Sequence, residues 1–297
     1  MAVFTQQVTQ HEALASLNNA GALNAPQPLI LERPAWRRVW HVSQVALIVS
    51  LAIAAYCIAW EYSTRSYLRG FSDAVIPASA TSLGKVEAIL GWMSHGPARD
   101  ASIPDDAFPD RDPSETLNYT SLLRTCGSAT NAFINLANTA NLPARRLLLR
   151  DNRGSVIHVV AEVLIDGRWI VVDPAFRAIM KGVDGHPLTR EELVDTSTLA
   201  SATRNLRGYS AAYNYRNTAH LHMARYPFGN LLAGSLATVF PNWDDSPLIS
   251  LIVERTSLAA TVVSIAVALA LVLLRIGLIF IRQRKRASTP QALPASF

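Results

Sequence analysis

Two long apolar runs dominate the hydrophobic pattern of this chain of 297 residues. The first covers residues 42–60 and is interrupted only by Ser43 and Gln44, and the second covers residues 258–281. Helices of this length match the hydrocarbon thickness of a bilayer, so both runs predict membrane-spanning helices. A cleaved signal peptide is the alternative for the first run, but a long polar segment precedes it and no small-residue cleavage site follows Trp60. An uncleaved anchor is therefore the favoured interpretation.

Basic residues flank both runs and indicate the orientation of the chain. They are Arg33, Arg37 and Arg38 before the first run, and Arg282, Arg284, Lys285 and Arg286 after the second. Lys and Arg favour the cytoplasmic side of a membrane, so both termini are expected in the cytoplasm. Arg275 lies near the end of the second run, where its long side chain can reach the interface.

The expected organisation is that of a bacterial inner-membrane protein with a periplasmic domain. It comprises a cytoplasmic tail (1–41), a first span (42–60), a periplasmic domain (61–257), a second span (258–281) and a basic cytoplasmic tail (282–297).

Between the spans, the pattern predicts one helix followed by three antiparallel strands, which makes the fold class α+β. Apolar residues at helical spacing follow Thr125, a possible N-cap, and the helix is expected to end at Asn141 and Pro143. Strands are expected at residues 144–149, 156–165 and 168–172. Asp166-Gly167, between the last two, is a strong signal for a two-residue hairpin.

Three other segments carry weaker signals. Residues 82–92 have helical spacing, and the apolar residues 228–240 are too few to span a bilayer, so they predict a core or interfacial helix near the second span. A Tyr-rich segment contains Tyr209, Tyr213 and Tyr215, and its pattern predicts no structure.

Charge and cysteine content narrow the possible functions. The net charge of +5 comes largely from residues beside the apolar runs, and no recognition motif accompanies it, so nucleic acid is not an expected partner. The two cysteines, Cys57 in the first span and Cys126 in the domain, are too separated to form a disulfide. Cys126 is then a lone thiol in an oxidising compartment, either a reactive group or a buried inert side chain.

Cys126, His158 and Asp173 have the chemistry of a cysteine nucleophile with its base and orienting carboxylate. A helix start stabilises the thiolate form, and Cys126 is expected at such a start. An imidazole held by a carboxylate is the usual base for a thiol, and these roles suit His158 and Asp173.

The predicted hairpin allows this pairing to be checked by register. A two-residue loop at Asp166-Gly167 pairs Ile165 with Arg168, and further along the same strands it pairs Val160 with Asp173. Side chains alternate along a strand, so His158 shares a face with Val160 and is the diagonal neighbour of Asp173. The two side chains are therefore expected within hydrogen-bonding reach.

These residues lie in a pattern that resembles the transglutaminase-like superfamily. The pattern is Cys126-Gly127 on a helix, Leu142-Pro143-Ala144-Arg145 at its exit, His158 on a strand, and Asp173-Pro174 after an Asp-Gly-Arg-Trp hairpin. The resemblance implies a papain-like core in which the Cys-bearing helix packs on an antiparallel sheet, here flanked by two transmembrane helices. It also implies that Cys126 is the nucleophile, His158 the base and later the acid, and Asp173 the residue that orients the imidazole.

Other residues are candidates for an oxyanion donor, a substrate contact or a metal ligand. Many bacterial relatives carry an acidic residue where this chain has Ser128, and the upstream candidates for the second oxyanion donor are Asn118 and Tyr119. Glu162 shares a strand face with His158 and is either a substrate contact or, as favoured here, a solvated edge charge. The alternating residues His220 and His222 have no third ligand at a usable spacing, so no metal or other cofactor is expected.

The leading hypothesis is a membrane-anchored cysteine enzyme that hydrolyses an amide or ester, or transfers its acyl group. The expected partners are the lipid bilayer and a periplasmic peptide, protein or glycan-linked amide. Members of the superfamily include peptidases, glutamine cross-linkers, amidases and bacterial proteins associated with envelope polysaccharide. The alternative hypothesis is a non-catalytic membrane scaffold within an assembly for envelope polysaccharide synthesis or export.

Overall fold

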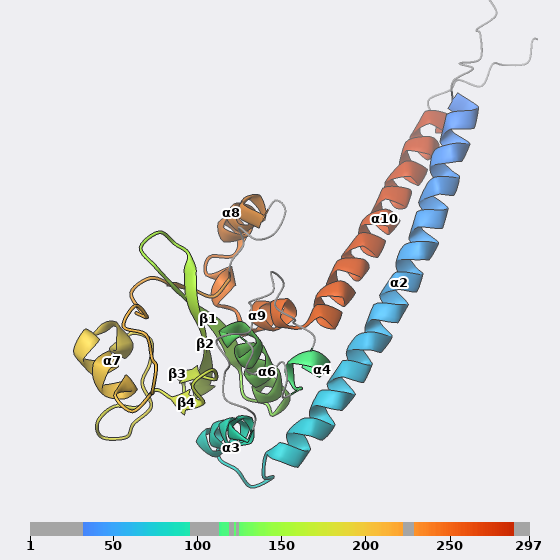
Figure 1. Cartoon of the computed structure of the whole chain (residues 1–297). Helices are drawn as coiled ribbons and strands as arrows, with labels where there is room; N and C mark the ends of the chain where they lie inside the picture. The colour runs from blue at the N-terminus through green and yellow to red at the C-terminus, as the bar shows by residue number, and fades with distance from the viewer. Residues whose placement is uncertain (1–31, 96–112, 119–121, 123–124, 222–228, 288–297) are drawn as a thin grey trace, which may run out of the picture. The chain divides into compact units, whose positions relative to one another are not determined.

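The computed structural model describes residues 32–95, 113–118, 122, 125–221 and 229–287 (Figure 1). The helices are α2 (Glu32–Val75), α3 (Ser82–Ser94), α4 (Pro113–Thr116), α6 (Cys126–Thr139), α7 (Thr196–Thr203), α8 (Gly229–Val239), α9 (Pro247–Glu254) and α10 (Thr256–Ala287). Short 3-10 helices are η1 (Glu192–Val194) and η3 (Trp243–Asp245). The strands are β1 (Ala144–Arg150), β2 (Val156–Ile165), β3 (Arg168–Asp173), β4 (Ala178–Ile179) and β5 (Thr218–Ala219).

The two predicted apolar runs lie within long helices. The stretches Arg37–Val75 of α2 and Thr256–Ile281 of α10 are long and apolar enough to cross a membrane, which fits a membrane-anchored protein. The chain divides into two compact units, one of Met1–Val49 with Ala268–Phe297 and one of Ser50–Val267. In the first unit, the Arg275 guanidinium lies 4.1 Å from the centre of the Trp40 ring and donates a hydrogen bond to Gln44.

The second unit contains an antiparallel sheet of five strands in the order β4-β3-β2-β1-β5, which makes it α+β, as predicted. The predicted hairpin is confirmed. Ile165 pairs with Arg168, and the register continues to the pair of Ala161 and Val172. Asp166 and Gly167 have φ values of 49° and 80°, the positive values that a tight type I′ hairpin requires at both central positions.

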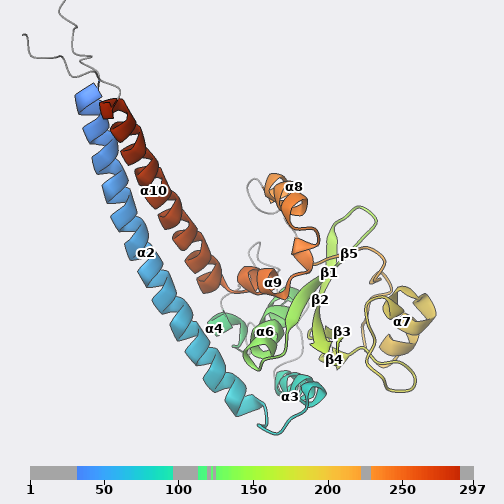
Figure 2. The ribbon, with the colours of Figure 1, turned by 180° about the vertical axis from the view of Figure 1, so that it is seen from behind.

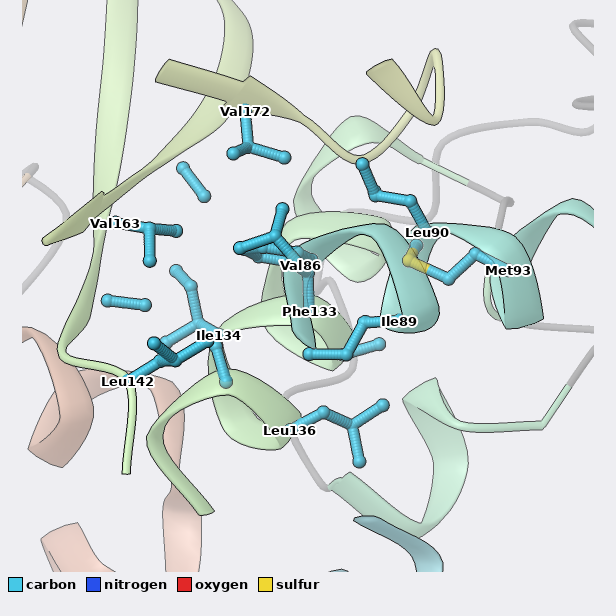
Figure 3. Close-up of a cluster of buried hydrophobic side chains, with 14 of the residues drawn as sticks. Val86, Ile89, Leu90, Met93, Phe133, Ile134, Leu136, Leu142, Val163 and Val172 are labelled. Carbon is cyan, nitrogen blue, oxygen red and sulfur yellow. The ribbon is translucent and has the colours of Figure 1, made fainter. Parts of the chain in front are cut away.

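Side chains from the sheet form two apolar layers, one on each face. On one face, Val163 and Val172 pack with Phe133 of α6 and Ile89 of α3 (Figure 3). On the other face, Val160 and other strand residues pack against the chain that follows β4; the fully buried members include Leu147, Leu149, Val171, Met180, Leu193 and Tyr215. The sheet therefore lies between α6 and the segment that carries α7 (Figure 2).

Local signals explain where α6 begins and ends. Thr125 caps its first turn in extended conformation, and Asn141 adopts the left-handed conformation (φ 59°) just after its last turn. The helix also donates a hydrogen bond from Thr130 Oγ1 to the carbonyl of Val159 in β2, at 3.1 Å. This bond ties the start of α6 to the strand residue that follows His158.

Replacing Phe133 with alanine should destabilise the domain strongly. The ring is fully buried between α6 and the sheet, and emptying such a site costs about 3–5 kcal/mol of unfolding free energy. The matched control is Val183→Ala, because Val183 is 90% exposed and should change the stability by no more than about 0.5 kcal/mol. Urea unfolding of the detergent-solubilised protein measures both, and equal losses would contradict this packing.

Candidate active site

Cys126 is the first residue of α6, and a reciprocal pair of hydrogen bonds fixes the turn that carries it. Thr125 Oγ1 accepts a bond from the backbone N–H of Ser128, and Ser128 Oγ accepts one from the backbone N–H of Thr125, both at 3.1 Å. Ser128, which departs from the pattern of many bacterial relatives, thus has a structural role here. The thiol is partly exposed at a helix end whose dipole favours a negative charge.

His158 and Asp173 form a buried pair on adjacent strands. His158 Nε2 lies 2.7 Å from Asp173 Oδ2, and the two residues are 1% and 0% exposed. The other carboxylate oxygen, Oδ1, accepts hydrogen bonds from the backbone amides of Ala175 and Phe176, at 3.1 and 3.2 Å. The turn after β3 therefore holds the carboxylate, and the carboxylate holds the imidazole.

Two opposing effects shift the pKa of His158. Burial alone lowers it, because a charged ring loses hydration. The hydrogen bonds to Asp173 and Cys126 and the negative charges of these two groups outweigh burial and raise the pKa from its ordinary 6.5 to about 9. The Cys126 thiol is thus close enough to interact with the ring.

The second ring nitrogen of His158 is the one left for the thiol. Nε2 is engaged by Asp173, whereas Nδ1 is buried and has no hydrogen bond of standard geometry among the described residues. An imidazole held at one nitrogen can exchange a proton at the other. The arrangement of Cys126, His158 and Asp173 is therefore one that can move a proton between sulfur and nitrogen.

Aromatic side chains enclose the imidazole. Tyr213 stacks on His158 with ring centres 4.2 Å apart and planes 5° from parallel, and Phe176 and Tyr209 approach edge-to-face with ring centres at 5.9 and 6.2 Å. The hydroxyls of Tyr209 and Tyr215 lie 3.2 Å apart, and burial raises the pKa of both phenols. The sequence pattern predicted nothing for this segment beyond its Tyr content.

A buried ion pair lies against the turn that carries Cys126. The Arg146 guanidinium binds both carboxylate oxygens of Glu254, at 2.5 Å each, and also donates a bond of 3.3 Å to the carbonyl of Gly127. Arg146 is 7% and Glu254 0% exposed. Asn131 of α6 donates hydrogen bonds to the backbone and side chain of Glu254, at 2.6 and 3.0 Å. Residues from β1, α6 and α9 thus meet beside Cys126.

The same polar network continues to the two apolar helices. The Arg255 guanidinium donates hydrogen bonds to Asn135 of α6, at 3.1 Å, and to Glu61 of α2, at 2.9 Å. Ser257, at the start of α10, donates a bond of 2.7 Å to the other oxygen of Glu61. No residue of this network was identified from the sequence, because no local pattern links positions so far apart.

Glu162 lies in a separate buried cluster. It accepts hydrogen bonds from Arg145 and from His220, both at 2.8 Å, and its carboxylate is 2% exposed. The prediction of a solvated edge charge was wrong, because β2 is the central strand of the sheet and the hydrogen bonds to Arg145 and His220 satisfy the buried carboxylate. Burial raises the pKa of Glu162, but His220 and Arg145 outweigh it and lower the pKa overall. The other nitrogen of His220 lies 2.7 Å from Asp245.

The remaining candidates lie at the margin of the described structure. Asn118 is exposed, and Tyr119 and His222 fall outside the described residues. The described part of the chain contains no group of three or more His, Cys, Asp or Glu side chains that could hold a metal ion.

Comparison with known proteins supports the resemblance seen in the sequence. Residues 69–174 match the core model of the transglutaminase-like superfamily. This match covers α3, α6 and the first three strands, and it includes Cys126, His158 and Asp173. This part of the chain is similar to transglutaminase-like domains. Searches of curated proteins and of solved structures found no significant match.

The raised pKa of His158 should make stability fall with increasing pH. A raised pKa stabilises the folded protein fully below pH 6.5, and this contribution, on the order of 3 kcal/mol, disappears between pH 6.5 and about 9. Asp173→Asn removes the main partner of the imidazolium, so the decline of the melting temperature from pH 6 to pH 9.5 should be smaller in that variant. Parallel declines in the two proteins would contradict the assigned coupling.

Removing one member of the Arg146–Glu254 pair should be more harmful than removing both. Arg146→Met or Glu254→Gln alone leaves a buried group without its partner, at a cost of about 3–5 kcal/mol of unfolding free energy, and the double variant should lose less than the sum. The matched control is Arg168→Met, whose partner Glu192 is exposed, with an expected cost below about 1 kcal/mol. Urea titrations measure the unfolding free energy of each variant. A double variant that loses as much as the two single variants together would show that Arg146 and Glu254 do not depend on each other.

Proposed function

We propose that this chain is a membrane-anchored cysteine enzyme that cleaves or transfers acyl groups of amides or esters on the periplasmic side of a bacterial inner membrane. The observation that carries the proposal is the buried His158–Asp173 pair, whose imidazole interacts with a partly exposed thiol at a helix start. This combination suits nucleophilic catalysis, and the transglutaminase-like match over residues 69–174 supports it.

In the acylation step, the sulfur of Cys126 bonds to the substrate carbonyl carbon. The raised pKa of His158 keeps the imidazole protonated at neutral pH, so Cys126 attacks as the thiolate with its proton already on Nδ1, and Asp173 stabilises the imidazolium through Nε2. The carbonyl electrons move onto oxygen in the tetrahedral intermediate. When they return, the bond to the leaving amine or alcohol breaks, that group takes the proton from His158, and a thioester to Cys126 remains.

In the second step, His158 removes a proton from water or from an acceptor amine. The nucleophile attacks the thioester carbonyl, and the proton returns to the departing sulfur of Cys126. Water as the acceptor gives hydrolysis, and an amine gives a new amide. Neither step requires a metal or an organic cofactor. The substrate class proposed is a periplasmic peptide, protein or glycan-linked amide.

Oxyanion stabilisation completes the proposed mechanism. The backbone amide of Cys126, at the start of α6, is the proposed first donor, because it belongs to the residue that attacks the carbonyl. Asn118 and Tyr119, shortly before α6 in the chain, are the candidates for the second. Losing one donor of this kind costs on the order of 3 kcal/mol of transition-state stabilisation.

Thiol labelling tests the proposal directly. An electrophilic thiol probe should label the wild-type protein and should not label Cys126→Ala, because the remaining Cys57 is only 6% exposed. Asp173→Asn should slow labelling at pH 7 severalfold, since the imidazolium that stabilises the thiolate loses its carboxylate. Equal labelling of wild type and Cys126→Ala would rule out a reactive Cys126.

A cellular assay separates the enzyme from the scaffold hypothesis. Full loss of cellular function in a stably folded Cys126→Ser variant is expected for an enzyme. Unchanged function in that variant, together with purification in fixed stoichiometry with membrane partners, would instead favour a non-catalytic role in an envelope polysaccharide assembly.

A further inference from the structure

Helix α9 buries its polar residues and leaves its apolar residues unburied, the opposite of a surface helix on a water-soluble domain. All eight of its residues are described, and only two of them, Ser250 and Glu254, are buried, both at 0% exposure. None of its apolar residues is buried, and Leu248 is 63% exposed. The other apolar members are Ile249, Leu251, Ile252 and Val253. A surface helix in water places apolar residues inward and polar ones outward.

Both buried polar side chains of α9 form hydrogen bonds to Arg146 of β1. Ser250 Oγ accepts a hydrogen bond of 3.0 Å from the backbone N–H of Arg146, and Glu254 holds the Arg146 guanidinium. The rotation of α9 is therefore fixed by two residues one turn apart. With this face committed, Leu248 is left exposed and the other apolar residues of the helix are only half-buried.

Exposed apolar side chains continue into the neighbouring segment. Leu231 of α8 is 70% exposed, and Phe240, which follows α8, is 62% exposed. From residue 229 to residue 253, the only charged residues are Asp244 and Asp245. Asp245 is engaged with His220, at 2.7 Å. The segment thus combines a large apolar surface with little charge, which is typical of a surface that contacts something other than water.

The connection to α10 indicates what covers this surface. Only Arg255 separates the end of α9 from Thr256, the first residue of the candidate membrane span. A helix with an apolar face beside a candidate span has the bilayer interface as its neighbouring environment, where such helices bind. Trp243 lies between α8 and α9, and Trp is enriched at that depth.

We propose that α8 and α9 form a lipid-facing platform whose apolar side chains insert into the bilayer leaflet on the side of the domain. The anchor would then include two interfacial helices besides the two spanning ones. Through Arg146, which binds both Glu254 and the carbonyl of Gly127, the platform connects to the turn that carries Cys126.

Spin-label accessibility in full-length protein tests the platform. The background is Cys57→Ala with Cys126→Ala, reconstituted in phosphatidylethanolamine–phosphatidylglycerol nanodiscs, with one nitroxide at Leu248→Cys or Phe240→Cys. Val183→Cys is the matched control, because Val183 is 90% exposed in the same unit. At positions 248 and 240, collisions with oxygen should exceed those with a water-soluble nickel chelate severalfold, and at position 183 the order should reverse.

Two outcomes would overturn the platform. The first is nickel access at positions 248 and 240 as high as at position 183, which would indicate exposure to water. The second is low access to both reagents with dipolar broadening, which would indicate that a second copy of the chain covers the face. Either result leaves the proposed thiol chemistry untouched, because the background variant lacks Cys126 and that chemistry is tested separately.

Discussion

The buried ion pair between Arg146 and Glu254 is the constraint on which the arrangement of the domain depends. A buried charge is tolerated only when its partners satisfy it fully. Here the carboxylate takes two bonds from the guanidinium and one from Asn131, and the guanidinium also reaches the Gly127 carbonyl. Satisfying this pair requires β1, α6 and α9 to come together, which places the thiol-bearing turn next to the segment that leads into α10.

The two buried histidines, His220 and His158, differ in how many of their ring nitrogens are held by carboxylates. His220 has both ring nitrogens within 2.8 Å of carboxylate oxygens, from Glu162 and Asp245, so its hydrogen-bonding capacity is used up. His158 is held by Asp173 at one nitrogen only, and the interaction with Cys126 remains for the other. The stacked ring of Tyr213 limits hydration of the imidazole without competing for its nitrogens.

Sequence reasoning reached the parts of the fold that local rules determine. The cap at Thr125, the hairpin at Asp166-Gly167 and the diagonal relation of His158 to Asp173 all follow from periodicity and turn chemistry over short distances. The partners of buried charges did not follow, because Arg146 and Glu254 are 108 positions apart and Glu162 and His220 are 58 apart. The structure of the Tyr-rich segment could not be predicted for a related reason. Irregular chain has no period, and the position of this segment depends on its packing against distant sheet residues and His158.

The route of the polar network also limits how the domain can be isolated. Glu61 lies within α2, and Arg255 and Ser257 lie at or just before the start of α10, yet their hydrogen bonds complete a network that begins beside Cys126. A recombinant fragment trimmed of its apolar helices at these positions would leave the buried Asn135 of α6 without the Arg255 guanidinium, while the Arg146–Glu254 pair would remain. Solubility gained by truncation would therefore come with unsatisfied polar groups beside α6, so expression work on this protein has to retain residues 61 and 255–257 and supply a detergent or lipid environment.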